Sequence, residues 1–241
     1  MAKQLRSLIG STCIITLLLG IYSAVAAESL NTLSAEEKAA GWKLLFDGKS
    51  HQGWRSFKRP TFPTRGWSIE NGWFYSSGKG GGDIVSEGEY DQFELQWEWK
   101  LTTNGNSGVK YFVTENRNSA LGHEYQMFDD ERDASGTVKP GKHVTASFYD
   151  VLKPSVNPPT KPAGQINQSR ILVQANHVEH WLNGIKVLEY KAGSEPVKAA
   201  VAASKFKSVP AFGSCVKGHI LLQDHQSEVW FRNIKIRVLP Q

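Results

Sequence analysis

Four short stretches of the chain combine acids, amides and imidazoles, the side chains that bind hydroxyl groups or remove protons. They are residues 104–108 (Asn-Gly-Asn-Ser-Gly), 123–130 (His-Glu-Tyr-Gln-Met-Phe-Asp-Asp), 180–184 (His-Trp-Leu-Asn-Gly) and 223–225 (Gln-Asp-His). Side chains alternate along a strand, so Glu124 and Gln126 share one face. Asn106 lies between glycines, where its amide could bind a sugar hydroxyl or cap its own turn. Together the groups suit a carbohydrate ligand, although a single histidine in such a place is more often structural.

Several familiar catalytic motifs are absent from the sequence. It holds no GxSxG nucleophile elbow and no GxxxxGK[ST] phosphate loop, and His123-Glu124 lacks the second histidine of HExxH. Gly78–Gly82 resembles a phosphate loop only in composition, and no helix is predicted after it. We therefore interpret this glycine cluster as a flexible turn.

The N-terminal residues 1–27 have the pattern of a secretory signal peptide. Lys3 and Arg6 precede an apolar run, and Ala24-Val25-Ala26 gives a small-residue cleavage site. The alternative is an uncleaved membrane anchor. Cleavage would remove two of the 28 basic residues and none of the 23 acidic ones, lowering the formal charge from +5 to +3. We expect a periplasmic or secreted protein with no later membrane span. Its mild charge and lack of a basic block argue against nucleic-acid binding.

The remaining chain predicts an all-β domain behind a short helical lead-in, residues 28–40. Ser34 can cap a helix with Glu37 completing a capping box, and Gly41 can end it. Asn183-Gly184 between two alternating runs is a strong hairpin signal. The expected strands are Trp42–Phe46, Trp67–Ile69, Trp73–Ser76, Ile84–Ser86, Phe93–Leu101, Gly108–Val113, Glu124–Phe128, Ser147–Val151, Gln168–Gln174, His177–Leu182, Ile185–Tyr190, His219–Gln223 and Glu228–Val238. Many short strands with tight turns predict a two-sheet antiparallel sandwich formed by residues 41–241 as one domain.

An ordered set of motifs makes the chain resemble the 3-keto-disaccharide hydrolase family. The set comprises LFDG (45–48), NSG (106–108), ExQxxDD (124–130), LNG (182–184), LQDH (222–225) and FRNI (231–234). The resemblance implies a concanavalin A-like jelly roll with a sugar-binding groove, and an enzyme that acts on glycosides already oxidised to the 3-keto form. The chain departs from the family where Lys110 follows the NSG strand in place of a common arginine. The substrate could therefore differ.

A 3-keto sugar changes the chemistry that a glycosidase needs. The ketone acidifies the C2 proton, so one base, one or two oxyanion donors and an acid for the leaving group suffice for β-elimination, which hydration then completes. Our hypothesis makes Glu124 or His225 the base, with Lys110 and Asn106 stabilising the enolate. The residues expected to bind substrate are Asn106, Gln126, Asp129, His180 and Gln223. A divalent cation could replace the oxyanion donors, with ligands drawn from Glu124, Asp129 and His225.

Three other functions are compatible with the same residues. A non-catalytic, lectin-like carbohydrate-binding module would use the same fold and the same polar face. Direct hydrolysis would need two carboxylates flanking the bond, and Glu124 with Asp129 or Asp224 is a conceivable pair. A structural or adhesive role is the least favoured, because the layout is that of a single secreted domain.

Overall fold

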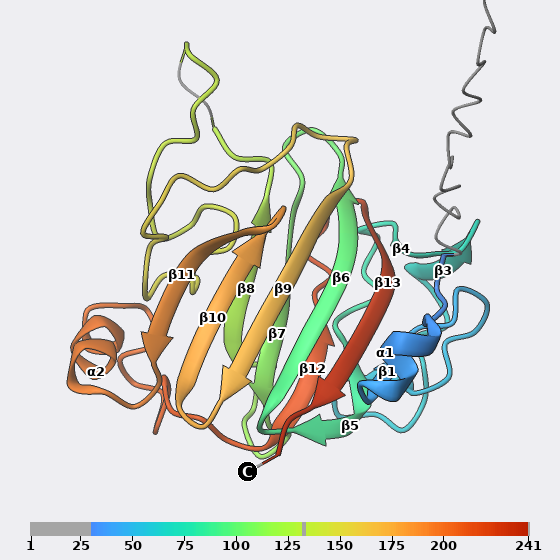
Figure 1. The fold of residues 1–241 in the computed structure, drawn as a ribbon, viewed down its shortest axis with the longest axis horizontal. Helices are drawn as coiled ribbons and strands as arrows, with labels where there is room; N and C mark the ends of the chain where they lie inside the picture. The colour runs from blue at the N-terminus through green and yellow to red at the C-terminus, as the bar shows by residue number, and fades with distance from the viewer. Residues whose placement is uncertain (1–29, 132–133, 241) are drawn as a thin grey trace, which may run out of the picture.

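A short capped helix precedes the first strand. The computed structural model describes residues 30–131 and 134–240, so the predicted signal peptide lies outside the described residues (Figure 1). Helix α1 (Ala35–Ala39) has Ser34 as its N-cap: Ser34 Oγ accepts from the Glu37 N–H at 3.1 Å, and the Glu37 carboxylate accepts from the Ser34 N–H at 2.9 Å. The predicted capping box is therefore confirmed. No helix in the described ranges is long and apolar enough to cross a membrane.

Two antiparallel sheets form the predicted sandwich (Figure 1). The larger, sheet A, has the order β11 (Ile185–Lys191), β10 (His177–Leu182), β9 (Asn167–Gln174), β6 (Phe93–Leu101), β13 (Val229–Val238), β4 (Trp73–Ser76) and β3 (Trp67–Glu70), and β1 (Trp42–Leu44) also pairs with β13. Sheet B has the order β2 (Trp54–Ser56), β5 (Ile84–Tyr90), β12 (Gly218–Leu222), β7 (Asn106–Val113) and β8 (His123–Phe128).

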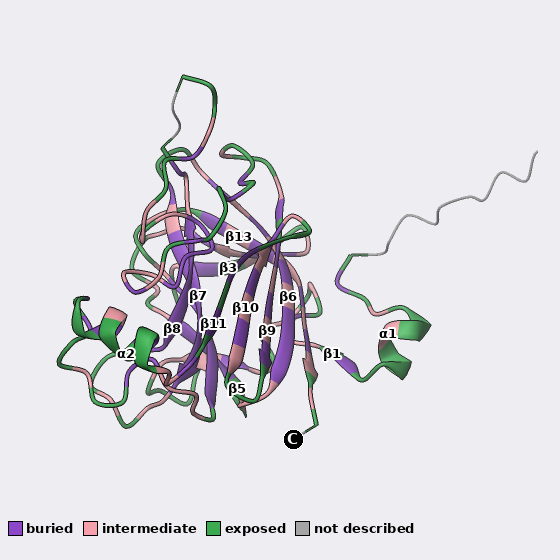
Figure 2. Ribbon diagram, turned by 60° about the vertical axis from the view of Figure 1, so that its left-hand side comes forward, coloured by how far each residue is buried: buried purple, intermediate pink, exposed green. Residues whose placement is uncertain are grey.

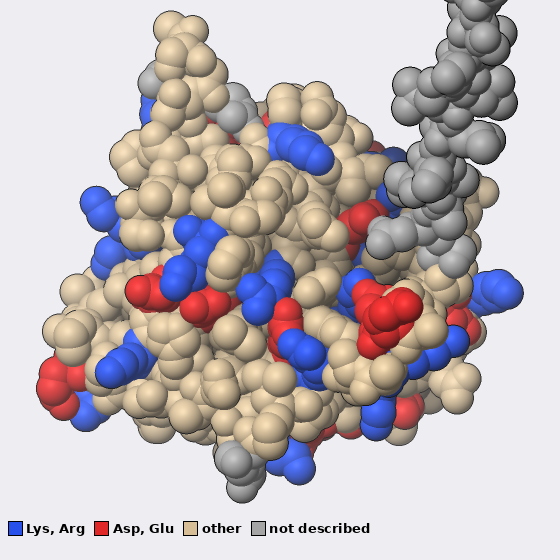
Figure 3. All heavy atoms as spheres, viewed as in Figure 1, with Lys and Arg blue, Asp and Glu red and all other residues tan. Residues whose placement is uncertain are grey.

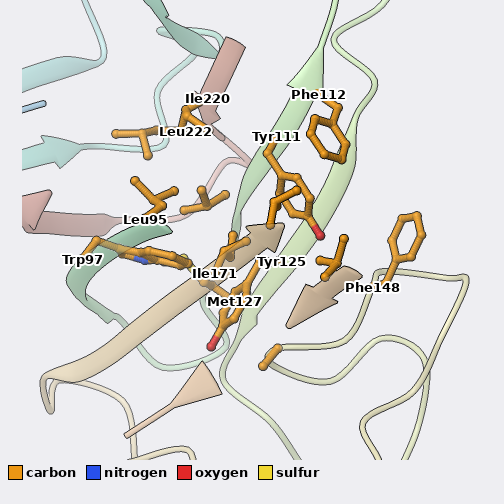
Figure 4. Packing of buried hydrophobic residues seen from close by; sticks show 14 of the residues in the cluster. Leu95, Trp97, Tyr111, Phe112, Tyr125, Met127, Phe148, Ile171, Ile220 and Leu222 are labelled. Carbon is orange, nitrogen blue, oxygen red and sulfur yellow. The ribbon is translucent and has the colours of Figure 1, made fainter. Parts of the chain in front are cut away.

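The core lies between the two sheets, as the alternation along β6 requires. Leu95, Trp97 and Trp99 are buried against inward side chains of sheet B such as Tyr111 and Tyr125 (Figures 2 and 4). Burying a large apolar side chain stabilises the fold by about 1.5–3 kcal/mol. The interior therefore selects which face of each strand is turned outward.

The polar face of β6 lies on the outside of sheet A. Glu94 pairs with Arg170 and Arg237, and Glu98 pairs with Arg232 at 2.7 Å. Acidic and basic side chains accordingly lie side by side over this face in Figure 3. This face of sheet A is therefore a surface of paired charges.

Two elements were not predicted, and one expected strand is irregular. The unpredicted elements are β2 and helix α2 (Glu195–Ala202). The segment expected as strand Ser147–Val151 forms only isolated bridges, in which Phe148 pairs with Tyr125 and Leu152. Ala146 and Asp150 have φ values of 64° and 62°, which break the extended conformation on each side of Phe148. This segment nevertheless continues sheet B beyond β8.

Candidate active site

The outward face of sheet B gathers polar side chains from β7 and β8. Tyr111 and Tyr125 point into the core, so alternation turns Lys110 and Glu124 to the other face. The β7–β8 register places Lys110 opposite Glu124 and Gly108 opposite Gln126. A Cβ atom at Gly108 would lie 2.8 Å from Glu124 Oε1. The glycine of the NSG motif therefore leaves room for the Glu124 carboxylate.

A buried ammonium lies between two carboxylates on this face. Lys110 Nζ lies 3.8 Å from Asp83 Oδ2 and 3.9 Å from Glu124 Oε2, and it donates to the Ala120 carbonyl at 3.3 Å. Lys110 is only 8% exposed and Glu124 only 7%. Such a grouping is electrostatically strong because little water screens it.

Burial controls the protonation of both carboxyls. It raises the pKa of Glu124, and the Lys110 charge opposes that rise. Burial likewise raises the pKa of Asp83, again opposed by Lys110. A small apolar cluster contributes to the dry surroundings: Val85, Val113 and Leu221 pack with Phe57 and Ala120 on this side of the sheet. Raised carboxyl pKa values beside a fixed cation are typical of acid–base sites.

Two amide oxygens of the site are buried without a partner. Gln126 donates from Nε2 to Asn106 Oδ1 at 3.2 Å, whereas its Oε1 has no hydrogen-bond partner among the residues that the structure describes. Gln223 Oε1 is in the same state, and so is Ser147 Oγ, whose segment lies beside Gln126 through the pairing of Phe148 with Tyr125. Buried acceptors without donors are rare in folded proteins. They indicate a place for a ligand that carries hydroxyl groups.

The Gln-Asp-His run fixes a neighbouring loop. Asp224 accepts from the Gly82 N–H at 2.9 Å and from Ser76 Oγ at 3.3 Å, and its own N–H donates to Asp83 at 3.0 Å. Trp67 Nε1 donates to the Gly82 carbonyl at 2.8 Å. Gly82, the last residue of the glycine cluster, is therefore held by Asp224 and Trp67, whereas the flexibility expected of the cluster stays a prediction.

Comparison of the sequence with known proteins assigns the chain to one family. The sequence pattern of the 3-keto-alpha-glucoside-1,2-lyase-like domain matches residues 41–237. The chain belongs to this family. A curated relative, the 3-keto-disaccharide hydrolase of Bacteroides thetaiotaomicron, is 32% identical over 90% of this chain and 84% of its own length. The predicted family resemblance is thus confirmed, and it makes the chain a glycoside hydrolase-like enzyme.

Solved structures of similar proteins support the same assignment. A predicted glycosyl hydrolase from Parabacteroides distasonis superposes with a TM-score of 0.77, at 34% identity over 88% of this chain and all of that one. A second one from the same organism gives 0.64, at 29% identity over 82% and 99% of the two chains. The predicted all-β sandwich of the family domain is confirmed.

The family domain brings most of the predicted site residues together. Glu124, Lys110, Gln126, Asn106 and Gln223 lie on neighbouring strands or strand ends of sheet B. His225 follows Asp224 at the end of the Gln-Asp-His run, and its side chain is exposed. Asp129 instead accepts from the Asn104 N–H at 2.9 Å and so caps the turn before β7.

The placement of His180 in a groove is corrected by the structure. Its side chain is 0% exposed and lies between the sheets, where Nε2 bonds to Tyr111 Oη at 2.8 Å and Nδ1 to the Ala146 carbonyl at 2.9 Å. The sequence contained a signal for this position. His180 shares a strand face with Leu182, and Leu182 belongs to the core.

Neither Asp83 nor a polar rim near Glu124 was indicated by the sequence motifs. Asp83 immediately precedes β5 and was not assigned a role. In the rim, Lys205 Nζ lies 4.2 Å from the ring centre of Tyr149, and His143 Nε2 lies 2.9 Å from Asp150 Oδ1. The Lys205 charge lowers the pKa of Glu124. These residues come from irregular segments, where no periodicity indicates a face.

The proposed cation ligands do not form a cluster. Among the described residues, the His, Asp and Glu side chains that bring three ligand atoms within 4.8 Å of one another are His177, Glu179 and Glu189. They lie on β10 and β11 of sheet A, and Lys186 already pairs with both glutamates. Glu124, Asp129 and His225 do not meet this distance.

Proposed function

We propose that the enzyme cleaves the glycosidic bond of 3-keto-glycosides by removing the C2 proton and eliminating the C1 substituent, with hydration of the product. The observation that carries this proposal is the buried Lys110 ammonium between the carboxyls of Asp83 and Glu124. An ammonium held in a dry, polar site is suited to stabilise an oxyanion that forms during a reaction.

The steps balance without an external oxidant or reductant. A base takes the C2 proton, and the C2–H electrons form the C2–C3 double bond of an enolate with its charge on the C3 oxygen. The ketone at C3 then re-forms, and the electrons of the C2–C3 double bond move to form a C1–C2 double bond conjugated to it. The bond between C1 and its oxygen breaks, and this oxygen leaves with a proton. Water adds its oxygen to C1 and a proton returns to C2, so the net change is hydrolysis.

We assign the base to Glu124 and the enolate donor to Lys110. The burial that raises the pKa of Glu124 also favours its neutral form, so accepting a proton relieves a buried negative charge. Asp83 has a raised pKa and lies on the other side of Lys110, where it can protonate the leaving oxygen. The unpartnered oxygens of Gln126 and Gln223 would accept from sugar hydroxyls.

A direct two-carboxylate hydrolase is the main catalytic rival. Asp83 and Glu124 could in principle serve as its acid and its nucleophile or base. The ammonium beside both of them favours elimination, because the enolate intermediate carries an anionic oxygen that needs a fixed cation. A lectin-like module would use the unpartnered amides but has no need of the buried charges.

The test compares a 3-keto-glucoside with its unoxidised parent. We expect turnover of the ketone alone, together with exchange of its C2 hydrogen in deuterium oxide. Glu124→Gln and Lys110→Met should each lower kcat at least about 100-fold. Lys139→Met is the matched control, since the Lys139 side chain is 62% exposed and pairs with Glu131 on the surface. Parental rates in both site variants would refute the site, turnover of the parent glycoside would favour the rival, and binding without turnover would favour the module.

Two further features of this function are proposals. The pattern of residues 1–27 supports export to the periplasm or the medium, which can be tested by the N-terminal sequence of the protein recovered from fractionated cells. A divalent cation is a secondary candidate for stabilising the enolate, near Glu124 and Asp83. The position of Lys110 between these two carboxyls favours the lysine for that role.

A further inference from the structure

A cavity adjoins the Asp83 side of the site. Its volume is about 420 Å³, and its lining includes Asp83, Ala120, Gly81, Arg59 and Arg65. Asp83 and Ala120 are also the two residues that hold the Lys110 ammonium on this side. Glu124 does not line it. A sugar placed over Lys110 would therefore direct one end toward this cavity.

Two arginines line the cavity without an acidic partner. Within the described ranges, neither Arg59 nor Arg65 has a carboxylate oxygen within 4.0 Å, whereas the neighbouring Arg55 pairs with Glu115 at 2.7 Å. Asp83 is the one carboxylate among the described lining residues, and Lys110 already faces it. A guanidinium presents paired donors that match the oxygens of a carboxylate or a phosphate.

The part of the cavity wall that Arg65 and Gly81 form is preformed. Gly66 and Gly81 cross so closely that a Cβ atom on Gly66 would lie 2.4 Å from the Gly81 nitrogen. A Cβ atom on Gly81 would lie 2.8 Å from the Arg65 carbonyl oxygen. This crossing ties the backbone of Arg65 to the glycine loop that Asp224 holds. A preformed wall lowers the entropy lost when a ligand binds.

We propose that this cavity receives the leaving group, and that the leaving group it selects carries an anionic substituent, a carboxylate or a phosphate. The inference rests on the proposed function, because it takes Asp83 as the acid that faces the leaving oxygen. The sugar ring then lies over Lys110, and the anionic end of the aglycone lies between Arg59 and Arg65.

The experiment uses matched 3-keto-glucosides that differ only in the substituent at the 4-position of a phenyl aglycone. The aglycones are 4-hydroxybenzoate, its uncharged amide, and 4-hydroxyphenyl phosphate. We expect kcat/KM for at least one anionic substrate to exceed that for the amide by roughly ten- to a hundredfold, mainly through KM. The two anionic arms decide between carboxylate and phosphate. Added salt should reduce the preference, since the arginines are exposed.

Charge-removing variants identify the source of the preference. Arg59→Gln and Arg65→Gln should each lower the anion-to-amide ratio about tenfold and leave turnover of the amide within twofold. Lys79→Gln is the matched control, because Lys79 belongs to the same glycine loop but does not line the cavity. Equal kcat/KM values for the three substrates, or an unchanged ratio in both arginine variants, would overturn the inference and leave the proposed function standing.

Failure of the proposed function gives a different result. If none of the three substrates is turned over, binding of free 4-hydroxybenzoate, its amide and the phosphate is measured by calorimetry on the parent and the two arginine variants. Tighter binding of an anion that is lost in these variants would support the anionic cavity on its own. Equal binding of all three compounds would refute it.

Discussion

The interior holds two histidines whose hydrogen bonds require them to be uncharged. His180 Nδ1 must donate to the Ala146 carbonyl, so Nε2 accepts from Tyr111 Oη. Tyr111 Oη in turn accepts from Tyr190 Oη at 2.7 Å, and Tyr190 Oη accepts from His123 Nδ1 at 2.9 Å. Every donor in this chain has one acceptor only if both imidazoles are neutral. His123 Nε2 is buried without a partner, so a proton there would have no acceptor among the described residues.

Lowering the pH should therefore destabilise the fold, and this should begin at a pH well above the pKa of most carboxyls. Burial lowers the pKa of His123 to about 3 and that of His180 to about 4. The unfolded chain has histidine pKa values of about 6.5, so it binds the proton more readily than the folded state does. The stability from neutral histidines is present above pH ~6.5 and is lost as the pH falls below it. At pH 5 each histidine removes about 2 kcal/mol, or about 4 kcal/mol together.

Two carboxyls, Glu124 and Asp83, stabilise the fold as the pH falls and so oppose the effect of the histidines. The pKa values of Glu124 and Asp83 are raised in the folded protein by burial, so their protonation on acidification favours folding. The loss of about 4 kcal/mol is therefore an upper value. Carboxyls whose pKa is lowered, such as Glu115 beside Arg55, lose their stabilising effect only at lower pH.

The assay is urea unfolding followed by tryptophan fluorescence at a series of pH values from 7.5 to 5. We expect the free energy of unfolding to fall by about 2–4 kcal/mol, with the slope beginning near pH 6.5. His180→Asn keeps a donor for the Ala146 carbonyl and should remove about half of the pH dependence. His143→Asn changes an exposed histidine and should leave it intact. A change of less than about 1 kcal/mol in the parent protein would refute the neutral hydrogen-bond chain.

Four other measurements test the site and its support. The pH dependence of kcat should show groups that titrate above the usual carboxyl range, because burial raises the pKa of both Glu124 and Asp83; a flat profile from pH 5 to 8 would contradict these roles. Gly108→Ala should lower kcat/KM at least about tenfold in a turnover assay while urea unfolding shifts by less than about 1 kcal/mol, because its Cβ meets a carboxylate oxygen that can move. Gly66→Ala should cost about 1–3 kcal/mol in the same unfolding assay, because its Cβ meets backbone and its φ is +79°. Incubation with a chelator should leave turnover within about twofold if Lys110 carries the enolate charge, whereas a loss restored by a divalent ion would assign that role to a metal.

The fold was predictable wherever a strand carries a regular alternation. Phe93–Leu101 has the predicted bounds, because one of its faces is apolar and the other polar. His177–Leu182 also has the predicted bounds, although its buried face includes His180. Strand β2 has three residues, too few for alternation to be visible. Helix α2 buries only Val197 and Val201, so its periodicity is weak. Tertiary contacts rather than local pattern specify these two elements.

The site residues that lie within strands were predictable from the sequence, whereas the loop residues that contact them were not. Glu124 and Gln126 share a face in any extended chain, so their grouping follows from alternation alone. Whether a given face is turned inward depends on the partner sheet, which is why His180 was misplaced. The position of Asp83 beside Lys110 depends on a loop that Asp224 holds from another strand end. Such contacts join residues that are distant in sequence and leave no periodic signal.

The same alternation links the interior to the site. Tyr111 belongs to the interior chain of hydrogen bonds, and its neighbour in β7, Lys110, carries the charge of the site. In β8, His123 of the same interior chain adjoins Glu124. The interior hydrogen bonds act together with apolar packing on the inward faces of β7 and β8, and the opposite faces carry the two charged side chains. A site built on paired strands needs little reorganisation when charge develops on a substrate. The buried histidines thus matter to the site through the geometry of β7 and β8, without contact with the substrate.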